Sequence, residues 1–159
     1  MAAPSGGPQE GDKAPAFTLE TDTGEKVSLA GLKGHKVVVY FYPKDDTPGC
    51  TKESIAFTGK LKDFEKTGTT VVGVSKDSCA SHAKFRAKYT LKHTLGADLD
   101  GKVVNDYGVW VEKNMYGIKS MGIERATFLI DEKGVVRKVW RKVKVDGHVD
   151  EVLDTVRAL

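Results

Sequence analysis

The chain has 159 residues, of which 40% are hydrophobic and 30% are charged, the balance of an ordinary folded domain. Its formal net charge of +3 is too small to indicate a nucleic acid or an acidic membrane surface as a partner. The sequence contains no apolar run of about 18 residues, so we expect no membrane-spanning helix and no membrane partner.

The first ten residues lack the basic start and the apolar stretch of a secretion signal. We therefore expect residues 1–10 to form a flexible tail and residues 11–159 to form a single domain. Two cysteines are too few for a disulfide scaffold. These features favour a reducing compartment, and we expect a cytoplasmic protein.

The first predicted elements are a hairpin, a strand and a helix. Residues 18–29 have the pattern of a short hairpin that turns at residues 22–24. The β-branched and aromatic run at residues 36–42 is typical of a central strand that is buried on both faces. Residues 51–66 follow as a helix, which ends before Gly68. Its apolar face consists of Phe57, Leu61 and Phe64.

A second strand and helix repeat this pattern. Residues 70–75 are predicted to form a buried strand, and Asp77 or Ser78 can cap a helix that runs to about Tyr89. The packing residues expected on this helix are Ala83, Phe85 and Tyr89.

The last third of the chain contains a short helix, a hairpin and a closing helix. A turn at residues 98–101 precedes a short helix at 103–107. Residues 126–130 and 135–143 flank a turn and form a hairpin. Residues 149–159 are predicted to form an amphipathic helix. Strand–helix–strand units followed by a hairpin and a helix indicate an α/β sandwich.

Cys50 lies where the first buried strand leads into a helix, next to Gly49 and shortly after Pro43 and Thr47. The unpaired N–H groups and the positive end of a helix macrodipole stabilise a thiolate at such a position. The alternative is a small buried apolar residue, the role of most free cysteines. The surrounding residues favour a reactive thiol.

Pro43, Thr47 and Cys50 match the Pro-x-x-x-Thr-x-x-Cys active-site motif of the peroxiredoxins, and residues 41–53 resemble their bacterioferritin-comigratory, or Q-type, subfamily. The resemblance continues along nearly the whole chain, at residues 11–19, 73–77, 107–110, 121–128 and 137–144. It implies a thioredoxin-like α/β fold with a central mixed sheet flanked by helices. It also implies a thioredoxin-dependent peroxidase that needs no metal, haem or flavin.

Arg125 could reach Cys50 although the two residues are distant in sequence. A right-handed crossover makes the strands before Cys50 and Cys79 parallel, so both thiols lie at one edge of the sheet. In thioredoxin-like folds the strand at residues 126–130 runs antiparallel to them and starts at that edge. By itself this segment favours a solvent-facing charge, but Arg125 aligns with the active-site arginine of the peroxiredoxins.

The resemblance gives each residue a role around the reacting peroxide. Arg125 and the Cys50 N–H would donate hydrogen bonds to peroxide. The Thr47 hydroxyl would accept from peroxide and donate to the sulfur, while Pro43 would shield the sulfur from water. Glu53 either orients Arg125 or is only a first-turn charge that favours the helix dipole.

The route back from the oxidised sulfur departs from the subfamily pattern. Members carry a second, resolving cysteine at the position of Ile55 or near that of Arg86, and neither residue is a cysteine here. Cys79 is the other thiol, at a helix start that should depress its pKa. Three roles of Cys79 compete. It forms an internal disulfide with Cys50, it is a bystander while an external thiol resolves Cys50, or it forms half of a metal site with His82.

The expected partners are a hydroperoxide and thioredoxin or a similar dithiol, and the expected assembly is a monomer or weak dimer. A thioredoxin-like reductant would need a second thiol separated from Cys50 by two residues, and that position is Glu53. A redox-sensing or holdase module remains as the non-enzymatic alternative. We also expect Trp110 and Tyr116 to pack near the site or to lie at its rim. Solvent exposure is expected of His35, His93 and His148. The basic residues at 137–144 are expected to form a solvated strand at an edge of the sheet.

Overall fold

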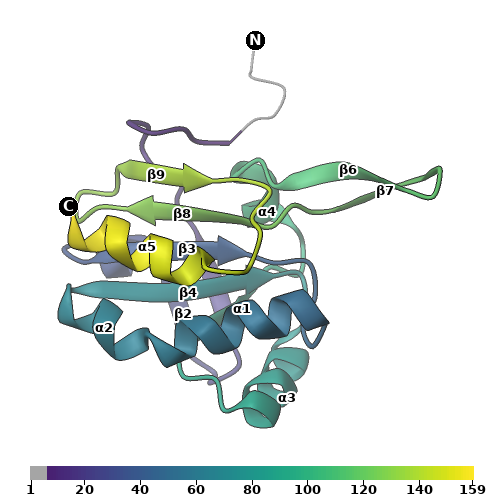
Figure 1. The fold of residues 1–159 in the computed structure, drawn as a ribbon, viewed down its shortest axis with the longest axis horizontal. Helices are drawn as coiled ribbons and strands as arrows, with labels where there is room; N and C mark the ends of the chain where they lie inside the picture. Colours follow the sequence, from purple (N-terminus) through teal and green to yellow (C-terminus); the bar gives the residue numbers. More distant parts are fainter. Residues whose placement is uncertain (1–6) are drawn as a thin grey trace.

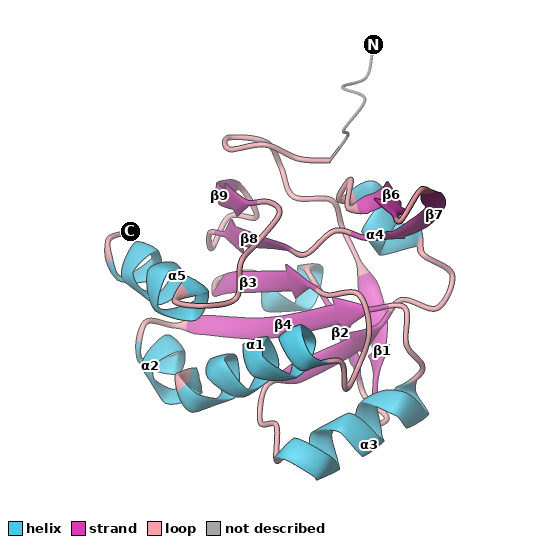
Figure 2. Ribbon diagram, turned by 45° about the vertical axis from the view of Figure 1, so that its right-hand side comes forward, coloured by secondary structure: helices cyan, strands magenta, loops and turns pink. Residues whose placement is uncertain are grey.

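A seven-stranded mixed sheet lies at the centre of the computed structural model, which describes residues 7–159 (Figures 1 and 2). The strand order is β2-β1-β5-β4-β3-β8-β9. These strands are β1 (Thr18–Thr21), β2 (Lys26–Ser28), β3 (Lys36–Phe41), β4 (Thr69–Ser75), β5 (Thr94–Ala97), β8 (Ala126–Ile130) and β9 (Val136–Trp140). The helices are the 3-10 helix η1 (Ala30–Leu32), α1 (Pro48–Gly59), α2 (Leu61–Lys66), α3 (Cys79–Tyr89), α4 (Lys102–Asp106) and α5 (His148–Arg157).

Strand directions bring three distant segments to one edge of the sheet. β3 runs parallel to β4 and antiparallel to β8, as predicted. The loop after β3 leads to Cys50, the turn after β4 leads to Cys79, and Arg125 directly precedes β8. The predicted α/β arrangement of a mixed sheet between helices is confirmed.

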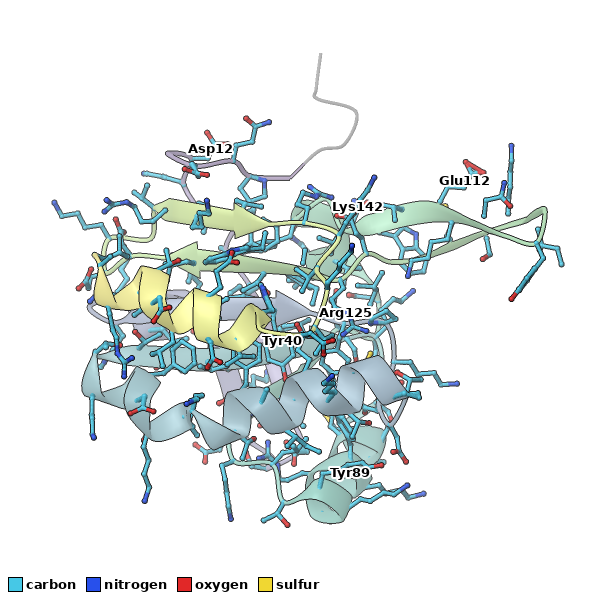
Figure 3. The ribbon with its side chains drawn as sticks, in the orientation of Figure 1. Asp12, Tyr40, Tyr89, Glu112, Arg125 and Lys142 are labelled. Atoms are coloured by element: carbon cyan, nitrogen blue, oxygen red, sulfur yellow. The ribbon has the colours of Figure 1, made fainter. Side chains whose placement is uncertain are left out.

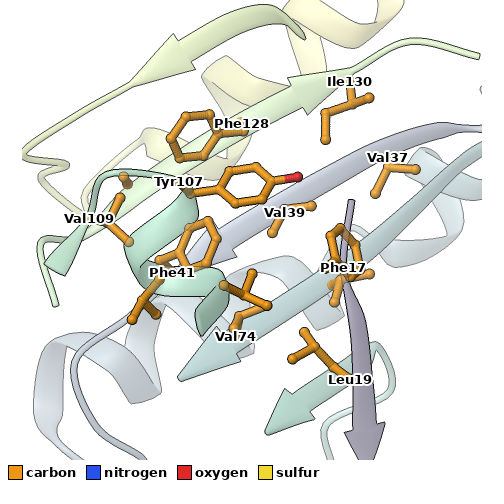
Figure 4. Close-up of a cluster of buried hydrophobic side chains, with 14 of the residues drawn as sticks. Phe17, Leu19, Val37, Val39, Phe41, Val74, Tyr107, Val109, Phe128 and Ile130 are labelled. Carbon is orange, nitrogen blue, oxygen red and sulfur yellow. The ribbon is translucent and has the colours of Figure 1, made fainter. Parts of the chain in front are cut away.

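β3 is buried on both faces because its side chains alternate between two cores. Val37, Val39 and Phe41 face a core that includes Tyr107 and Phe128 (Figure 4). The side chains between them face the other core, to which α1, α2, α3 and α5 also contribute. Its members include Val38, Tyr40, Phe57, Phe64, Phe85 and Val152. The two-sided burial predicted for this strand is confirmed.

The single helix predicted at residues 51–66 is two helices. α1 begins earlier, at Pro48, whose fixed φ suits a first helical position. Lys60 interrupts the helix with φ −107° and ψ 7°, directly after Gly59, a poor helix former. The break lets both Phe57 and Phe64 reach the core, where their ring centroids lie 5.9 Å apart.

α3 begins and ends as predicted. The Ser78 side chain caps it by accepting a hydrogen bond of 3.1 Å from the Ser81 N–H. Phe85 is buried, but Ala83 is exposed, so its predicted packing role is wrong. Ala83 lies on the solvent side because the buried face of α3 is formed by His82 and Phe85.

Two further structures were not predicted. β5 is only four residues long and contains a glycine, which weakens a strand pattern. β6 (Trp110–Met115) and β7 (Ile118–Ile123) form a separate hairpin that projects beyond the sheet (Figure 1). Tyr116, at the turn of this hairpin, is 98% exposed, so its predicted packing near the site is wrong. Trp110 is half-buried, with Lys76 Nζ 4.2 Å from its ring centroid.

Residues 1–6 of the predicted tail lie outside the described residues. Pro8 is buried and the Gln9 N–H donates to the Asp12 carboxylate over 2.8 Å, so residues 7–10 contact the domain. The basic strand β9 lies at the edge of the sheet, as predicted. Among residues 7–159, no helix is both long and apolar enough to cross a membrane.

Candidate active site

Cys50 is the third residue of α1 and its side chain is buried, with 1% of the residue exposed. Pro48 has no N–H, and the N–H groups of Gly49 and Cys50 precede the first intrahelical hydrogen bond. Thr47 occupies the N-cap position but makes no side-chain cap, so it does not use these donors. The first turn of α1 therefore offers N–H groups to an anion or to a bound substrate.

The Arg125 guanidinium contacts both Cys50 and Glu53. Its Nη2 lies 3.3 Å from Cys50 Sγ, and its Nη1 donates to Glu53 Oε1 over 2.7 Å. Figure 3 shows Arg125 above the N-terminal end of α1. The backbone of Arg125 is also held, because its carbonyl accepts a 3.0 Å hydrogen bond from the Val143 N–H. The predicted approach of Arg125 to Cys50 is confirmed.

Gly49 makes room for the guanidinium. A Cβ atom at this position would lie 3.0 Å from Arg125 Nη2, tighter than ordinary contacts. Its role is a close approach of the backbone to a side chain, one of the uses of glycine in folded proteins.

Glu53 is fully buried and pairs with Arg125, so it is not a solvent-facing charge of the first helical turn. Its Oε2 has no hydrogen-bond partner among the described residues. Burial raises the pKa of Glu53 to about 7, although the charge and hydrogen bond of Arg125 oppose this shift. The carboxyl group therefore changes its charge near neutral pH.

Thr47 and Pro43 lie in the loop between β3 and α1, and both are half-buried. The Thr47 hydroxyl donates to the Lys44 carbonyl over 2.8 Å. The predicted donation from Thr47 to the sulfur is therefore not the arrangement observed. With its hydrogen directed to Lys44, the Thr47 oxygen keeps its lone pairs for an incoming donor.

Lys113 of β6 is a charged residue near the site that sequence reasoning missed. Burial and the Arg125 charge lower the pKa of Lys113, while Cys50 and Glu124 raise it. Its aliphatic stem runs beside Gly122 of β7, where a Cβ would lie 3.2 Å from Lys113 Cδ. The only signal in the sequence is a lysine in an alternating strand, which is common at surfaces.

Cys79 begins α3 as a free, partly exposed thiol. Its pKa is raised, by burial first and then by the negative charges of Glu20 and Asp22. The predicted depression of this pKa is wrong because burial first, and then the carboxylates of Glu20 and Asp22, disfavour the thiolate. The two carboxylates that raise the pKa of Cys79 belong to β1 and the turn after it, and not to α1.

His82 does not belong to a metal site with Cys79. Its Nδ1 lies 2.7 Å from Asp45 Oδ2 and its Nε2 lies 3.1 Å from the Gly96 carbonyl oxygen. Both ring nitrogens are therefore used within the protein. Among residues 7–159, no group of three or more His, Cys, Asp or Glu is arranged to hold a metal ion.

Two of the three histidines expected in solvent are buried. His93 is hydrogen-bonded to Tyr40 Oη at 2.5 Å and to Thr58 Oγ1 at 2.9 Å. His148 Nε2 lies 2.8 Å from Thr127 Oγ1, and the imidazole packs edge to face against the Trp140 ring. Burial lowers the pKa of His93 to about 3 and that of His148 to about 4. Only His35 is exposed as predicted.

Comparison with known proteins gives a consistent family. A model described as the AhpC/TSA family matches residues 10–139. A putative peroxiredoxin bcp of Coxiella burnetii is 58% identical over 143 residues, which cover 90% of this chain and 95% of that protein. Peroxiredoxin Bcp of Bacillus subtilis is 46% identical over 147 residues, which cover 92% of this chain and 94% of that protein.

Among solved structures, the bacterioferritin comigratory protein of Xanthomonas campestris has a TM-score of 0.86 at 44% identity. The match covers 89% of this chain and 90% of that one, and that protein is described as having alkyl peroxide reduction activity. The likeness confirms the predicted thioredoxin-like fold class. The chain belongs to the AhpC/TSA family and is a peroxiredoxin, a thiol-dependent peroxidase that groups with the bacterioferritin-comigratory, or Q, type.

Proposed function

We propose that Cys50 is the peroxidatic cysteine and that it reduces hydrogen peroxide and alkyl hydroperoxides. The observation that carries this proposal is the 3.3 Å contact between Arg125 Nη2 and Cys50 Sγ at the first turn of a helix. A fixed positive charge and unpaired N–H groups both favour the thiolate. The reduction of alkyl peroxides by the Xanthomonas relative extends the proposed substrates to organic hydroperoxides.

The proposed reaction is a two-electron transfer at one oxygen. The Cys50 thiolate attacks the terminal oxygen, an S–O bond forms, and the O–O bond breaks. The sulfur is oxidised to a sulfenic acid. The peroxide is reduced, and its leaving oxygen departs as alkoxide or hydroxide and takes a proton to give an alcohol or water.

Ionisation of the thiol alone does not account for such catalysis. An ordinary thiol is about 3% ionised at pH 7, so full ionisation gains at most about thirtyfold, or about 2 kcal/mol. Enzymes commonly lower barriers by about 8 kcal/mol or more. The remainder must come from donors that stabilise the charge on the departing oxygen, which we assign to Arg125 and the Cys50 N–H.

The neighbouring residues hold this arrangement. Glu53 orients Arg125 through the 2.7 Å contact of Oε1 with Nη1. The Thr47 oxygen is assigned as an acceptor for the peroxide O–H, and the Lys44 carbonyl fixes its hydroxyl. Pro43 is assigned to shield the sulfur and to stiffen the loop, because its ring fixes φ.

For recycling, we propose that Cys79 resolves the Cys50 sulfenic acid. The Cys79 sulfur attacks Cys50 Sγ, an S–S bond forms, and the S–O bond breaks. The leaving hydroxide takes the thiol proton and becomes water. Thioredoxin or a similar dithiol then reduces the disulfide and is itself oxidised. Such recycling requires a reducing compartment, which is why we propose a cytoplasmic location.

A second route is favoured by the surroundings of Cys79. Because burial, Glu20 and Asp22 raise the pKa of Cys79, little of this thiol is ionised at neutral pH. An external thiol that attacks Cys50 directly would avoid this difficulty. On this route Cys79 is a bystander, and the enzyme uses one cysteine.

Steady-state peroxide consumption with thioredoxin and its reductase tests the proposal. The parent should turn over repeatedly and Cys50→Ser should be inactive, whereas consumption of a single equivalent would indicate a sensor. Mass spectrometry after one equivalent of peroxide separates the two recycling routes. Loss of two hydrogens supports the internal disulfide, while a sulfenic or sulfinic adduct in the parent, with unchanged turnover in Cys79→Ser, supports the external thiol.

A further inference from the structure

The Lys113 side chain lies across one face of the β6–β7 hairpin. In the register of the hairpin, Lys113 pairs with Ser120. A Cβ atom at Gly122, two residues further along β7, would nevertheless lie 3.2 Å from Lys113 Cδ, 3.4 Å from its Cε and 3.6 Å from its Nζ. The side chain therefore crosses diagonally to the opposite strand, toward the base of the hairpin. Gly122 leaves this path open because it has no side chain.

The base of the hairpin leads directly to the Cys50 site. β7 is followed by Glu124 and then by Arg125. The Glu124 carboxylate accepts a 2.8 Å hydrogen bond from Arg141 Nε, which fixes this junction. Three residues of chain span at most about 11 Å, so Gly122 and the Lys113 ammonium beside it lie near Arg125. Charges at such distances still interact, because screening by salt acts over about 8–10 Å in water and more weakly in a partly buried place.

The charge of Lys113 has no carboxylate to balance it. The residue is half-buried, and among residues 7–159 it forms no ion pair. A cation beside the Arg125 guanidinium is unfavourable by itself, and the Arg125 charge helps burial to lower the pKa of Lys113. Cys50 acts in the opposite direction and raises this pKa. Because such coupling is reciprocal, the Lys113 ammonium favours the negative form of Cys50 by the same free energy.

We propose that Lys113 is the second positive charge of the Cys50 site and that it keeps the sulfur ionised at acidic to neutral pH. This inference rests on the proposed function, in which the Cys50 thiolate is the group that attacks peroxide. Among the described residues, Lys113 donates no hydrogen bond to Cys50. It acts through its charge and is therefore a positioning residue, whereas Arg125 contacts the sulfur.

Lys113 should affect the formation of the thiolate more than its reaction. The negative charge is on the sulfur before the reaction and moves to the departing oxygen in the transition state. A cation that contacts neither atom stabilises both states to a similar extent, so it adds little to the rate once the sulfur is ionised. Arg125, which is assigned to the departing oxygen, should matter at every pH.

The other titratable groups around the sulfur are the same in the parent and in a Lys113 variant. Glu53 has a pKa of about 7, raised by burial, and so changes its charge within the range of interest. Burial raises the pKa of Tyr40 well above its ordinary value, so this phenol stays neutral. A difference between parent and variant therefore reports the charge of Lys113.

Four variants separate the charge of Lys113 from its shape. Lys113→Met removes the charge and keeps an apolar stem, and Lys113→Arg keeps the charge. Gly122→Val keeps the lysine but occupies the path of its side chain. Lys119→Met is the matched control, because Lys119 is an exposed lysine of the same hairpin. It pairs with Asn114, so it lies on the opposite face from Lys113.

Two measurements are made on each variant between pH 4 and 9. The ultraviolet absorbance of the Cys50 thiolate, with the signal of Cys50→Ser subtracted, gives the midpoint pH of its ionisation. Rapid mixing with one equivalent of hydrogen peroxide and intact-mass analysis give the rate constant for oxidation of Cys50.

Lys113→Met should raise the midpoint pH by about half a unit, which leaves about threefold less thiolate below the midpoint. Its rate constant should fall about threefold in that range and stay within about twofold of the parent on the plateau at higher pH. Gly122→Val should shift the midpoint in the same direction. Lys113→Arg and Lys119→Met should keep the midpoint of the parent.

Equal midpoints in Lys113→Met and Lys119→Met would overturn the inference. A rate constant that falls by the same factor at every pH in Lys113→Met would also overturn it, because that is the effect of a disturbed site and not of a lost charge. The titration needs no peroxide, so its outcome is separate from the proposed function. A Cys50→Ser variant that still turned over peroxide would contradict the proposed function itself.

Discussion

Arg125 Nη2 lies 3.3 Å from Cys50 Sγ, although 75 residues separate the two in the chain. The contact exists because β8 runs antiparallel to β3, which brings the start of β8 to the edge where α1 begins. The same guanidinium is held by Glu53, so its position relative to the sulfur is determined from two sides.

Replacing Arg125 with methionine should leave the fold intact and lower the rate constant for peroxide at least about tenfold, because the developing charge loses its main donor. The rate constant is measured by following Cys50 oxidation under single-turnover conditions. Arg137→Met is a matched control, since Arg137 is exposed and, among residues 7–159, its one ion pair is with Asp131, at 3.5 Å. An Arg125→Met enzyme that reacts as fast as the control would contradict the assigned role.

Gly49→Ala should slow the reaction with peroxide by about threefold or more without loss of stability. The new Cβ would lie 3.0 Å from Arg125 Nη2 and push the guanidinium away from the sulfur. Gly59→Ala makes the same change in the same helix, where no atom lies within 4 Å of the new Cβ. Single-turnover kinetics and urea unfolding of both variants provide the comparison, and equal kinetics would show that Arg125 adapts without cost.

Glu53→Gln should change how stability depends on pH. Glu53 has a folded-state pKa of about 7, raised from an ordinary value of 4.5. Between these values the folded state holds a proton that the unfolded state has lost, so the parent loses stability as the pH rises, by up to about 1.4 kcal/mol per unit. Glutamine does not titrate. Urea unfolding at pH 5, 6, 7 and 8 should therefore show that the stability of the variant relative to the parent increases up to about pH 7. A difference in stability that is the same at every pH would show that the pKa of Glu53 lies outside this pH range.

His93→Gln should have the opposite effect. Burial lowers the pKa of His93 from 6.5 to about 3, so below pH 6.5 the unfolded state binds a proton that the folded state does not. The parent therefore loses stability as the pH falls from 6.5 toward 3, by up to about 1.4 kcal/mol per unit, and the variant should lack this loss. His35→Gln, at an exposed position, serves as control and should keep the slope of the parent. Denaturation by urea at pH 4.5 and 6.5 measures the difference.

Much of the fold could be predicted from local patterns. The two-sided burial of β3, the Ser78 cap of α3 and the hairpin of β8 and β9 depend on residues within a few positions of one another. The parallel pairing of β3 with β4 followed from the handedness of crossovers. Local patterns also located Cys50 at a helix start.

The break at Lys60 and the β6–β7 hairpin could not be predicted in this way. Gly59 is a weak signal by itself, and the break is favoured because Phe57 and Phe64 both reach one core that is formed by distant elements. The hairpin lacks a strong alternating pattern because most of β7 is exposed.

The amino-acid sequence alone determined the order of most elements and the position of Cys50 at a helix start. The resemblance to the peroxiredoxins, taken with strand direction, then indicated that Arg125 would reach Cys50. Only the tertiary structure decided the environment of each titratable side chain. It buried His93, surrounded Cys79 with the charges of Glu20 and Asp22, and placed Glu53 where its carboxyl has a pKa of about 7. Backbone propensities act over a few neighbouring residues, whereas burial and electrostatic potential are sums over groups that meet only when the chain has folded.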